Sequence, residues 1–196
     1  MTFGAEPDTD PDVPALRALA RGDMGGLQIL ADRHGPRLLS FLTGLTGDRQ
    51  LAEEVLQDTW VALWRGAAGF VGGSTVRTWI YGIGRRRARD TLRRRRPDLP
   101  DDGTVTLNAV DPAAGPERLA MVRADVDAVA AAMSALRPLH REVLLLACVH
   151  EMTTPQIAAV LDVPVGTVKS RLSNARATLV TALSHAQAPG GGTDEH

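Results

Sequence analysis

Residues 153–179 carry the sequence TTPQIAAVLDVPVGTVKSRLSNARATL, which predicts two short helices on either side of a proline-containing break. Thr153 followed by Gln156 is a capping-box pattern, and Thr154 before Pro155 is a second possible helix start. Helical spacing predicts an inner face made of Ile157, Ala158, Leu161, Val165, Val168, Leu172, Ala175 and Leu179. The pattern indicates a helix-turn-helix, whose second helix can enter the DNA major groove.

The outer face of the second helix is polar and basic. Between residues 165 and 178 there are three basic residues and no acid, which suits a helix lying between rows of phosphates. A helical hairpin with a solvated basic face is the alternative. Spacing predicts that the outer face contains Thr167, Ser170, Arg171 and Asn174, flanked by Lys169, Ser173 and Arg176.

A second basic helix is predicted from Ser74 or Thr75 to just before Pro97. Trp79 and Tyr81 precede eight arginines within residues 85–96. Arginines neutralise phosphates, and aromatic faces can stack on unpaired bases, so the segment favours contact with nucleic acid. In the alternative, the arginines are a solvated helix end; for Trp79 itself, we expect a place in the core.

An acidic helix is predicted over residues 49–65. Its exposed edge would carry Glu54, Gln57 and Asp58, and Val61 would extend that edge with an apolar group. A DNA-binding unit has no need of an acidic outer edge, which favours a protein partner. A solvated helix face is the alternative.

Both compact parts of the chain look helical, and alternating strand patterns are absent, so the predicted fold class is all-α with two small domains. The chain has 196 residues and a net charge of −1, but nine arginines and one acid lie between residues 77 and 96. We expect helical units at 15–95 and 117–186. A disordered acidic start at 1–14, a flexible acidic Pro-rich linker at 96–116 and a disordered tail at 187–196 would flank them.

Other chemistry is weakly represented. One cysteine excludes an intramolecular disulfide and a Cys-rich zinc site. Cys148 lies in the run LLLACV and is expected in the core, and the five histidines show no metal spacing. No Walker-type phosphate loop, signal peptide or apolar run of membrane-spanning length is present, so we expect a soluble, cytoplasmic protein with no cofactor and no membrane insertion.

Three segments together resemble bacterial RNA polymerase sigma factors of the extracytoplasmic-function (ECF, group IV) class. They are AEEVLQDTWVALW at 52–64, FVGGSTVRTWIYGIGRRRARDTLRRRR at 70–96, and PVGTVKSRL at 164–172. Their order and spacing also match, and the resemblance covers about 27–95 and 117–182. It implies a transcription initiation factor, not an enzyme, with core RNA polymerase, promoter DNA and an anti-sigma factor as partners.

The resemblance also implies roles for each segment. Residues 52–65 would be region 2.2, which docks on the clamp helices of the polymerase β′ subunit. Residues 66–95 would be regions 2.3 and 2.4, which open the minus-10 element, and residues 137–180 would be region 4, which binds the minus-35 element and the β flap. The implied contacts are Glu54, Gln57, Asp58 and Val61 for polymerase; Arg77, Trp79, Tyr81, Arg85, Arg86 and Arg89 for minus-10 DNA; and Thr167, Lys169, Ser170, Arg171, Asn174 and Arg176 for minus-35 DNA.

The chain departs from the family pattern in the basic helix. Gly84-Arg85-Arg86 stands where alanine-arginine-asparagine is common, and Arg87 and Arg89 replace apolar residues. These changes affect the expected minus-10 preference. Two other functions are alternatives. A stand-alone helix-turn-helix regulator would need a dimerising seam, which is not evident. A nuclease would need clustered carboxylates to hold its metal, and the acids near the basic helix are too sparse.

Overall fold

The computed structural model describes residues 10–95, 132–133 and 136–187 and confirms the all-α prediction, since no strand occurs in these ranges. The expected linker, the start of the second expected helical unit and most of the expected tail lie outside the described residues. The helices in chain order are α1 (Val13–Ala20), α2 (Met24–Thr46), α3 (Arg49–Gly66), the short 3₁₀ helix η1 (Ala67–Gly69), α4 (Val76–Arg95), α6 (Pro138–Leu144), the π-helical η2 (Leu145–Val149), α7 (Thr154–Leu161) and α8 (Val165–Gln187).

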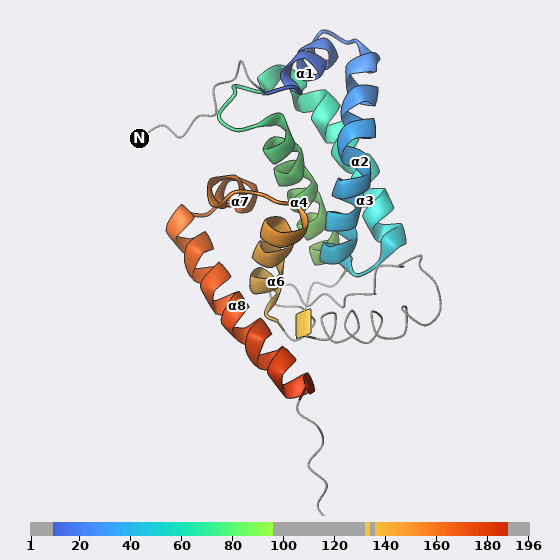
Figure 1. Ribbon diagram of the computed structural model, residues 1–196. Coiled ribbons are helices and arrows are strands. Elements are labelled where there is room, and N and C mark those ends of the chain that lie inside the picture. Colours follow the sequence, from blue (N-terminus) through green and yellow to red (C-terminus); the bar gives the residue numbers. More distant parts are fainter. Residues whose placement is uncertain (1–9, 96–131, 134–135, 188–196) are drawn as a thin grey trace, which may run out of the picture.

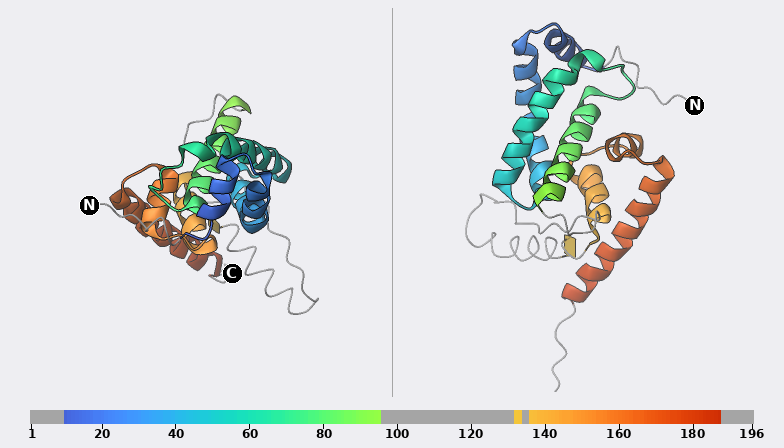
Figure 2. Two further views of the ribbon diagram at one scale, coloured as in Figure 1. Left: turned by 90° about the horizontal axis from the view of Figure 1, so that it is seen from above. Right: turned by 180° about the vertical axis from the view of Figure 1, so that it is seen from behind.

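The N-terminal unit, residues 10–95, is built on α2, α3 and α4, which lie side by side (Figures 1 and 2). Polar caps set the helix boundaries, because the first amides of a helix have no partner within it. Asp23 and Asp48 accept hydrogen bonds from the amides of Gly25 and Leu51, at 2.8 and 3.1 Å. The apolar stripes then meet in a core that includes Leu30, Leu38, Phe41, Leu42, Val55, Leu63 and Ile80.

Residues 10–14, which were expected to be disordered, are held in place, so the expectation is corrected for these five residues. Asp12 is buried, and its carboxylate lies 2.7 Å from the ring of His34 and contacts Arg33. Asp10 accepts a hydrogen bond of 2.7 Å from the amide of Val76 at the start of α4. The two carboxylates therefore hold the start of α1 against α2 and α4. Their partners lie 21 or more residues away in the sequence.

The C-terminal unit, residues 136–187, contains α6, η2, α7 and α8. The helical stretch from Pro138 to Val149 is divided into α6 and η2, because its last turn is π-helical: the amide of His150 bonds to the carbonyl of Leu145, at 3.0 Å. This wider turn rotates the following side chains. Cys148 is exposed and His150 is buried, so the expectation of a core position for Cys148 is wrong.

The two units pack against each other. α4 contacts α7, and α2 contacts η2. Figure 1 shows α6 and α7 beside α4, with α8 on the side away from α2. One side of α4 therefore packs against the C-terminal unit.

Candidate functional site

The outer edge of α3 is exposed along its length. Glu54, Gln57, Asp58 and Val61 all lie in solvent, while Val55 and Leu63 on the opposite face are buried in the core. The side chains expected to bind polymerase thus form one continuous surface.

Sequence reasoning missed Trp64 as part of this edge. Trp64 is 48% exposed and Val61 is 43% exposed, so the acidic edge ends in two exposed apolar groups. Trp60, one turn earlier, is instead half-buried and packs near Gly35. Aromatic side chains are enriched in protein interfaces, and tryptophan is among the residues that most often carry the binding energy there.

The acidic edge of α3 adjoins the basic end of α4. The Glu54 carboxylate lies 2.9 Å from the guanidinium of Arg95. Both side chains are about half exposed, so the pair contributes little to stability. A shallow hollow here is lined by Glu54, Val55, Asp58, Thr91, Arg94 and Arg95. The surface changes from negative to positive at this point.

The predicted DNA-contacting side chains of α4 divide between two faces. Arg86 is exposed, as is its neighbour Arg87, whereas Arg89 is half-buried and has an interaction partner. Tyr81 and Arg85 are buried, and both contact the C-terminal unit. The structure therefore leaves only part of the predicted set open to solvent.

Trp79 packs on the loop between η1 and α4. Its ring is 5.1 Å from the ring of Phe70, and an ideal Cβ at Gly66 would lie 3.5 Å from it. It is half-buried and packs against the core, as expected. The start of α4 is set by Thr75, whose hydroxyl accepts a 3.2 Å bond from the Thr78 amide.

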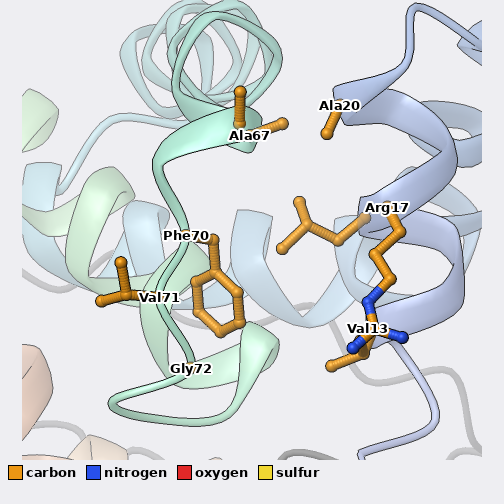
Figure 3. A pocket seen from close by; sticks show the side chains of 9 residues that line it. Val13, Arg17, Ala20, Ala67, Phe70, Val71 and Gly72 are labelled. Carbon is orange, nitrogen blue, oxygen red and sulfur yellow. The ribbon is translucent and has the colours of Figure 1, made fainter.

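The same loop borders a cavity of about 350 Å³ opposite α1 (Figure 3). Phe70 faces the cavity from the loop, and Val13 and Arg17 extend into it from α1. Val71 is almost fully exposed, and Gly72 has a left-handed backbone (φ 77°) that favours glycine. Arg17 places a cation beside the glycine-rich loop, and nothing in the sequence pattern signalled it.

The helix-turn-helix is present as α7 and α8. The amide of Thr153 donates a 2.9 Å bond to the Gln156 side chain, as expected for a capping box. α7 ends at Leu161, and the next residue, Asp162, has a left-handed backbone (φ 55°). The second helix then begins at Val165, as the break predicted.

The exposed face of α8 matches the expected outer face only in part. Lys169, Ser170, Ser173, Asn174 and Arg176 are exposed, whereas Thr167 and Arg171 are half-buried. Arg171 lies toward α6: burial, followed by the charges of Arg137 and Arg171, lowers the pKa of His140. Val165 is 38% exposed and not part of the inner face, which corrects that assignment. Lys169 and Ser170 thus face solvent more fully than Arg171.

The contact between the units contains a buried ion pair. Arg85 of α4 is 5% exposed and Glu142 of α6 is 6% exposed. The guanidinium donates twice to the carboxylate, at 2.5 and 3.2 Å, and once to the carbonyl of Leu161 at the end of α7, at 3.3 Å. All three bonds cross from one unit to the other.

His150 fills a ring-lined site on the N-terminal unit. Its ring lies 5.5 Å from Phe41 and 5.4 Å from Tyr81, and Nδ1 is 3.1 Å from the Tyr81 hydroxyl. Arg77 donates to the backbone carbonyl of His150 and lies over the Tyr81 ring. Burial, with the nearby charges of Arg77 and Arg37, lowers the pKa of His150 to about 4, so the ring is neutral near pH 7. Burial raises the pKa of Tyr81.

Neither a metal site nor a membrane span emerges from the described part of the chain. No group of three or more His, Cys, Asp or Glu residues there could hold a metal ion. None of its helices combines the length and the apolarity needed to cross a bilayer.

Comparison with known proteins gives matches to both units. The family model for Sigma-70 region 2 matches residues 30–97, and that for Sigma-70 region 4 matches residues 127–179. The RNA polymerase sigma factor CnrH of Cupriavidus metallidurans is 30% identical over 181 residues, covering 89% of this chain and 95% of that protein.

Two solved structures have similar folds. The structure of CnrH in complex with the cytosolic domain of CnrY has a TM-score of 0.67 and 26% identity, covering 89% of this chain and 97% of that one. The structure of the sigma factor RpoE in complex with the anti-sigma factor NepR from Bartonella quintana has a TM-score of 0.60 and 25% identity, covering 76% of this chain and 91% of that one.

Proposed function

The chain belongs to the sigma-70 family of RNA polymerase sigma factors, within its ECF group, and on that premise we propose how its surfaces share promoter recognition. The outer edge of α3 docks on the clamp helices of the polymerase β′ subunit. The loop before α4 and the arginines of α4 capture the minus-10 element. The exposed face of α8 binds the minus-35 element, and the C-terminal unit also touches the β flap.

The observation that carries this proposal is the separation of acidic and basic surfaces on the N-terminal unit. Glu54, Gln57, Asp58 and Val61 are exposed along α3, next to the basic end of α4. An acidic, partly apolar edge would repel DNA but suits a basic protein surface. The arginines beside it would then meet DNA that the polymerase brings to the same side.

Promoter opening would proceed without catalytic chemistry in this chain. Unpaired bases stack on aromatic or arginine surfaces, and phosphates pair with arginines, so the unwound form of the DNA is stabilised by capture. The cavity between Phe70 and α1 suits a flipped base, because it combines an aromatic ring with the Arg17 cation. The polymerase itself supplies the catalysis, and the chain would act in the cytoplasm.

We also propose an anti-sigma factor as partner. Support comes from the solved structures of similar fold, in which CnrH is bound to CnrY and RpoE to the anti-sigma factor NepR. The exposed apolar groups Val61 and Trp64 offer a surface for which such a partner and the polymerase would compete.

Reconstituted transcription tests the function directly. The purified protein is mixed with core polymerase and a library of bacterial genomic fragments, and the transcripts are mapped at their 5′ ends. We expect discrete start sites that require both proteins. DNA binding without any polymerase-dependent start sites would instead indicate a stand-alone regulator.

A further inference from the structure

The glycine-rich loop, residues 70–75, joins η1 to α4, and its middle is open to solvent. Val71 is almost fully exposed, and an ideal Cβ at Gly73 would meet no atom within 4 Å. A loop with so little packing around its middle takes its position from its two ends. The first end follows η1, which packs against α1.

The second end of the loop is linked to α1 by the side chain of Asp10. Its Oδ2 accepts a hydrogen bond of 2.7 Å from the amide of Val76, the first residue of α4. Its Oδ1 accepts a bond of 3.0 Å from the amide of Asp12, the residue just before α1. A carboxylate is stabilised beside a helix N-terminus, and this one lies at two of them. One side chain therefore joins the starts of α1 and α4.

Helix α1 is itself held firmly on α2. The buried Asp12 carboxylate lies 2.7 Å from the ring of His34 and contacts Arg33. The two helices also cross closely at Gly26, where a Cβ would overlap the carbonyl oxygen of Ala15. Because α1 has no room to shift toward α2, it can act as a fixed support for the loop.

The same helix supplies one wall of the cavity that borders the loop (Figure 3). Phe70 faces the cavity from the loop side. The wall on the α1 side consists of four residues at the spacing of one helix face, namely Val13, Leu16, Arg17 and Ala20. The width of the cavity is therefore the separation of the loop from α1, which the Asp10 side chain limits at the α4 end.

We propose that Asp10 is a positioning residue for base capture: its carboxylate links the glycine-rich loop to α1 and keeps the cavity between Phe70 and α1 formed before an unpaired base enters. The proposal rests on the proposed function, in which this cavity receives a flipped base of the minus-10 element. Asp10 acts through the loop and not by touching DNA. Without its carboxylate, α4 keeps the cap from the Thr75 hydroxyl, but the loop is free to move away from α1. The ordering of the loop would then reduce the binding energy of the base.

Abasic DNA tests the proposal in the complex with core polymerase. The probe is a fluorescent fork-junction DNA, single-stranded across the minus-10 element of a promoter mapped by the reconstituted transcription. Abasic sites replace the bases of its nontemplate strand one position at a time. With the wild-type protein, one abasic position should weaken binding at least about fivefold, because a base stacked on an aromatic ring accounts for that factor. With Asp10→Ala, the same abasic site should weaken binding less than about twofold, because the base is no longer held.

Two further variants separate positioning from stability. Asp23→Ala removes a cap of the same kind, the 2.8 Å bond to the Gly25 amide at the start of α2. It should lower the melting temperature as a lost cap does, yet leave the abasic effect at its wild-type size. Asp10→Ser keeps a hydroxyl that can accept the bond from Asp12, but its single oxygen cannot also bridge to Val76. It preserves the start of α1 and should lose the abasic effect as Asp10→Ala does, so the test does not depend on Asp10→Ala being well folded.

Two results overturn the role of Asp10 alone: an abasic effect of wild-type size in both Asp10 variants, or an equal loss of the effect in Asp23→Ala. A failure of the proposed function looks different. In that case the wild-type complex shows no abasic position of this size, which removes the capture cavity and the role of Asp10 with it.

Discussion

Arg85 and Arg86 are neighbours in the sequence, yet their side chains have opposite surroundings. Arg85 is buried against Glu142, and Arg86 is in solvent. A run of arginines shows that a polyanion partner is favoured, but it does not show which members face that partner, because that depends on what packs against α4. Because the Arg86 side chain is exposed while the two units are docked, we expect Arg86 to be the one of the two that contacts phosphate.

We expect Arg86→Ala to reduce the salt dependence of single-stranded DNA binding. Each lost phosphate contact should lower the slope of log K against log salt by about 0.7. Titrations at several salt concentrations measure this slope, and Arg49→Ala on α3 serves as the exposed control. An unchanged slope for Arg86→Ala would show that this arginine is only solvated.

The orientation of α8 changes which side chain should distinguish bases. Because Lys169 is exposed and Arg171 is half-buried toward α6, we expect Lys169→Ala to relax base preference at one or two upstream positions. Arg171→Ala should weaken all upstream sequences about equally, since a phosphate contact carries no sequence information. Transcription from a promoter library with randomised upstream bases compares them. The opposite pattern would restore the orientation predicted from spacing alone.

At the scale of elements, sequence patterns located α3, α4, α7 and α8 because each has an apolar stripe of helical period. They failed at η2, where a π-helical turn changes the direction in which the following side chains point and leaves Cys148 exposed. They also failed at α1, because Asp10 and Asp12 are held by partners distant in the sequence. Local periodicity contains neither kind of information.

Gly26 marks a close crossing of α1 and α2. A Cβ at this position would overlap the carbonyl oxygen of Ala15, which is backbone and cannot move easily. We expect Gly26→Ala to lower the free energy of unfolding by about 1–3 kcal/mol, the usual cost of overpacking. Chemical denaturation measures it. Gly35→Ala in the same helix, with only an ordinary contact to Trp60 at 3.9 Å, should be neutral or stabilising, and equal losses in both variants would contradict the close crossing.

At the scale of the whole molecule, the sequence indicated two helical units but not their contact. Arg77, Tyr81 and Arg85 were predicted as minus-10 contacts, and the structure gives them partners in the C-terminal unit. Glu142 and His150, which supply those partners, carried no sequence signal beyond a lone acid and a lone histidine beside an apolar run. Contacts between units depend on shape, which spacing does not encode.

The contact between the N-terminal and C-terminal units should weaken as the pH falls. His150 has a pKa of about 4 when docked, and an exposed histidine titrates near its ordinary value of 6.5. Between these two pH values, His150 binds a proton when the units are apart but not when they are docked. Docking of the two units is therefore fully favoured above about pH 6.5 and weakens as the pH falls toward about 4. Arg77 and Arg37 face the ring and oppose its protonation, while Tyr81 bonds to it and Glu151 lies beside it in the chain.

Small-angle scattering between about pH 7.5 and pH 5 measures this dependence. The radius of gyration of the wild-type protein should increase toward pH 5. His150→Gln, which cannot titrate in this range, should show no such trend whatever its baseline. A trend of equal size in this variant would assign the pH dependence to other groups.

The most direct measurement concerns the outer edge of α3, on which the account of a polymerase-bound initiation factor depends. Core polymerase is captured with tagged wild-type protein, with Asp58→Arg, and with Asp32→Arg, which reverses an exposed acid on α2. A like charge facing a basic partner surface costs several kcal/mol. We therefore expect Asp58→Arg to abolish capture with its helical circular dichroism unchanged, and Asp32→Arg to behave as wild type. Capture by Asp58→Arg at the wild-type level would contradict the assignment of this edge to polymerase.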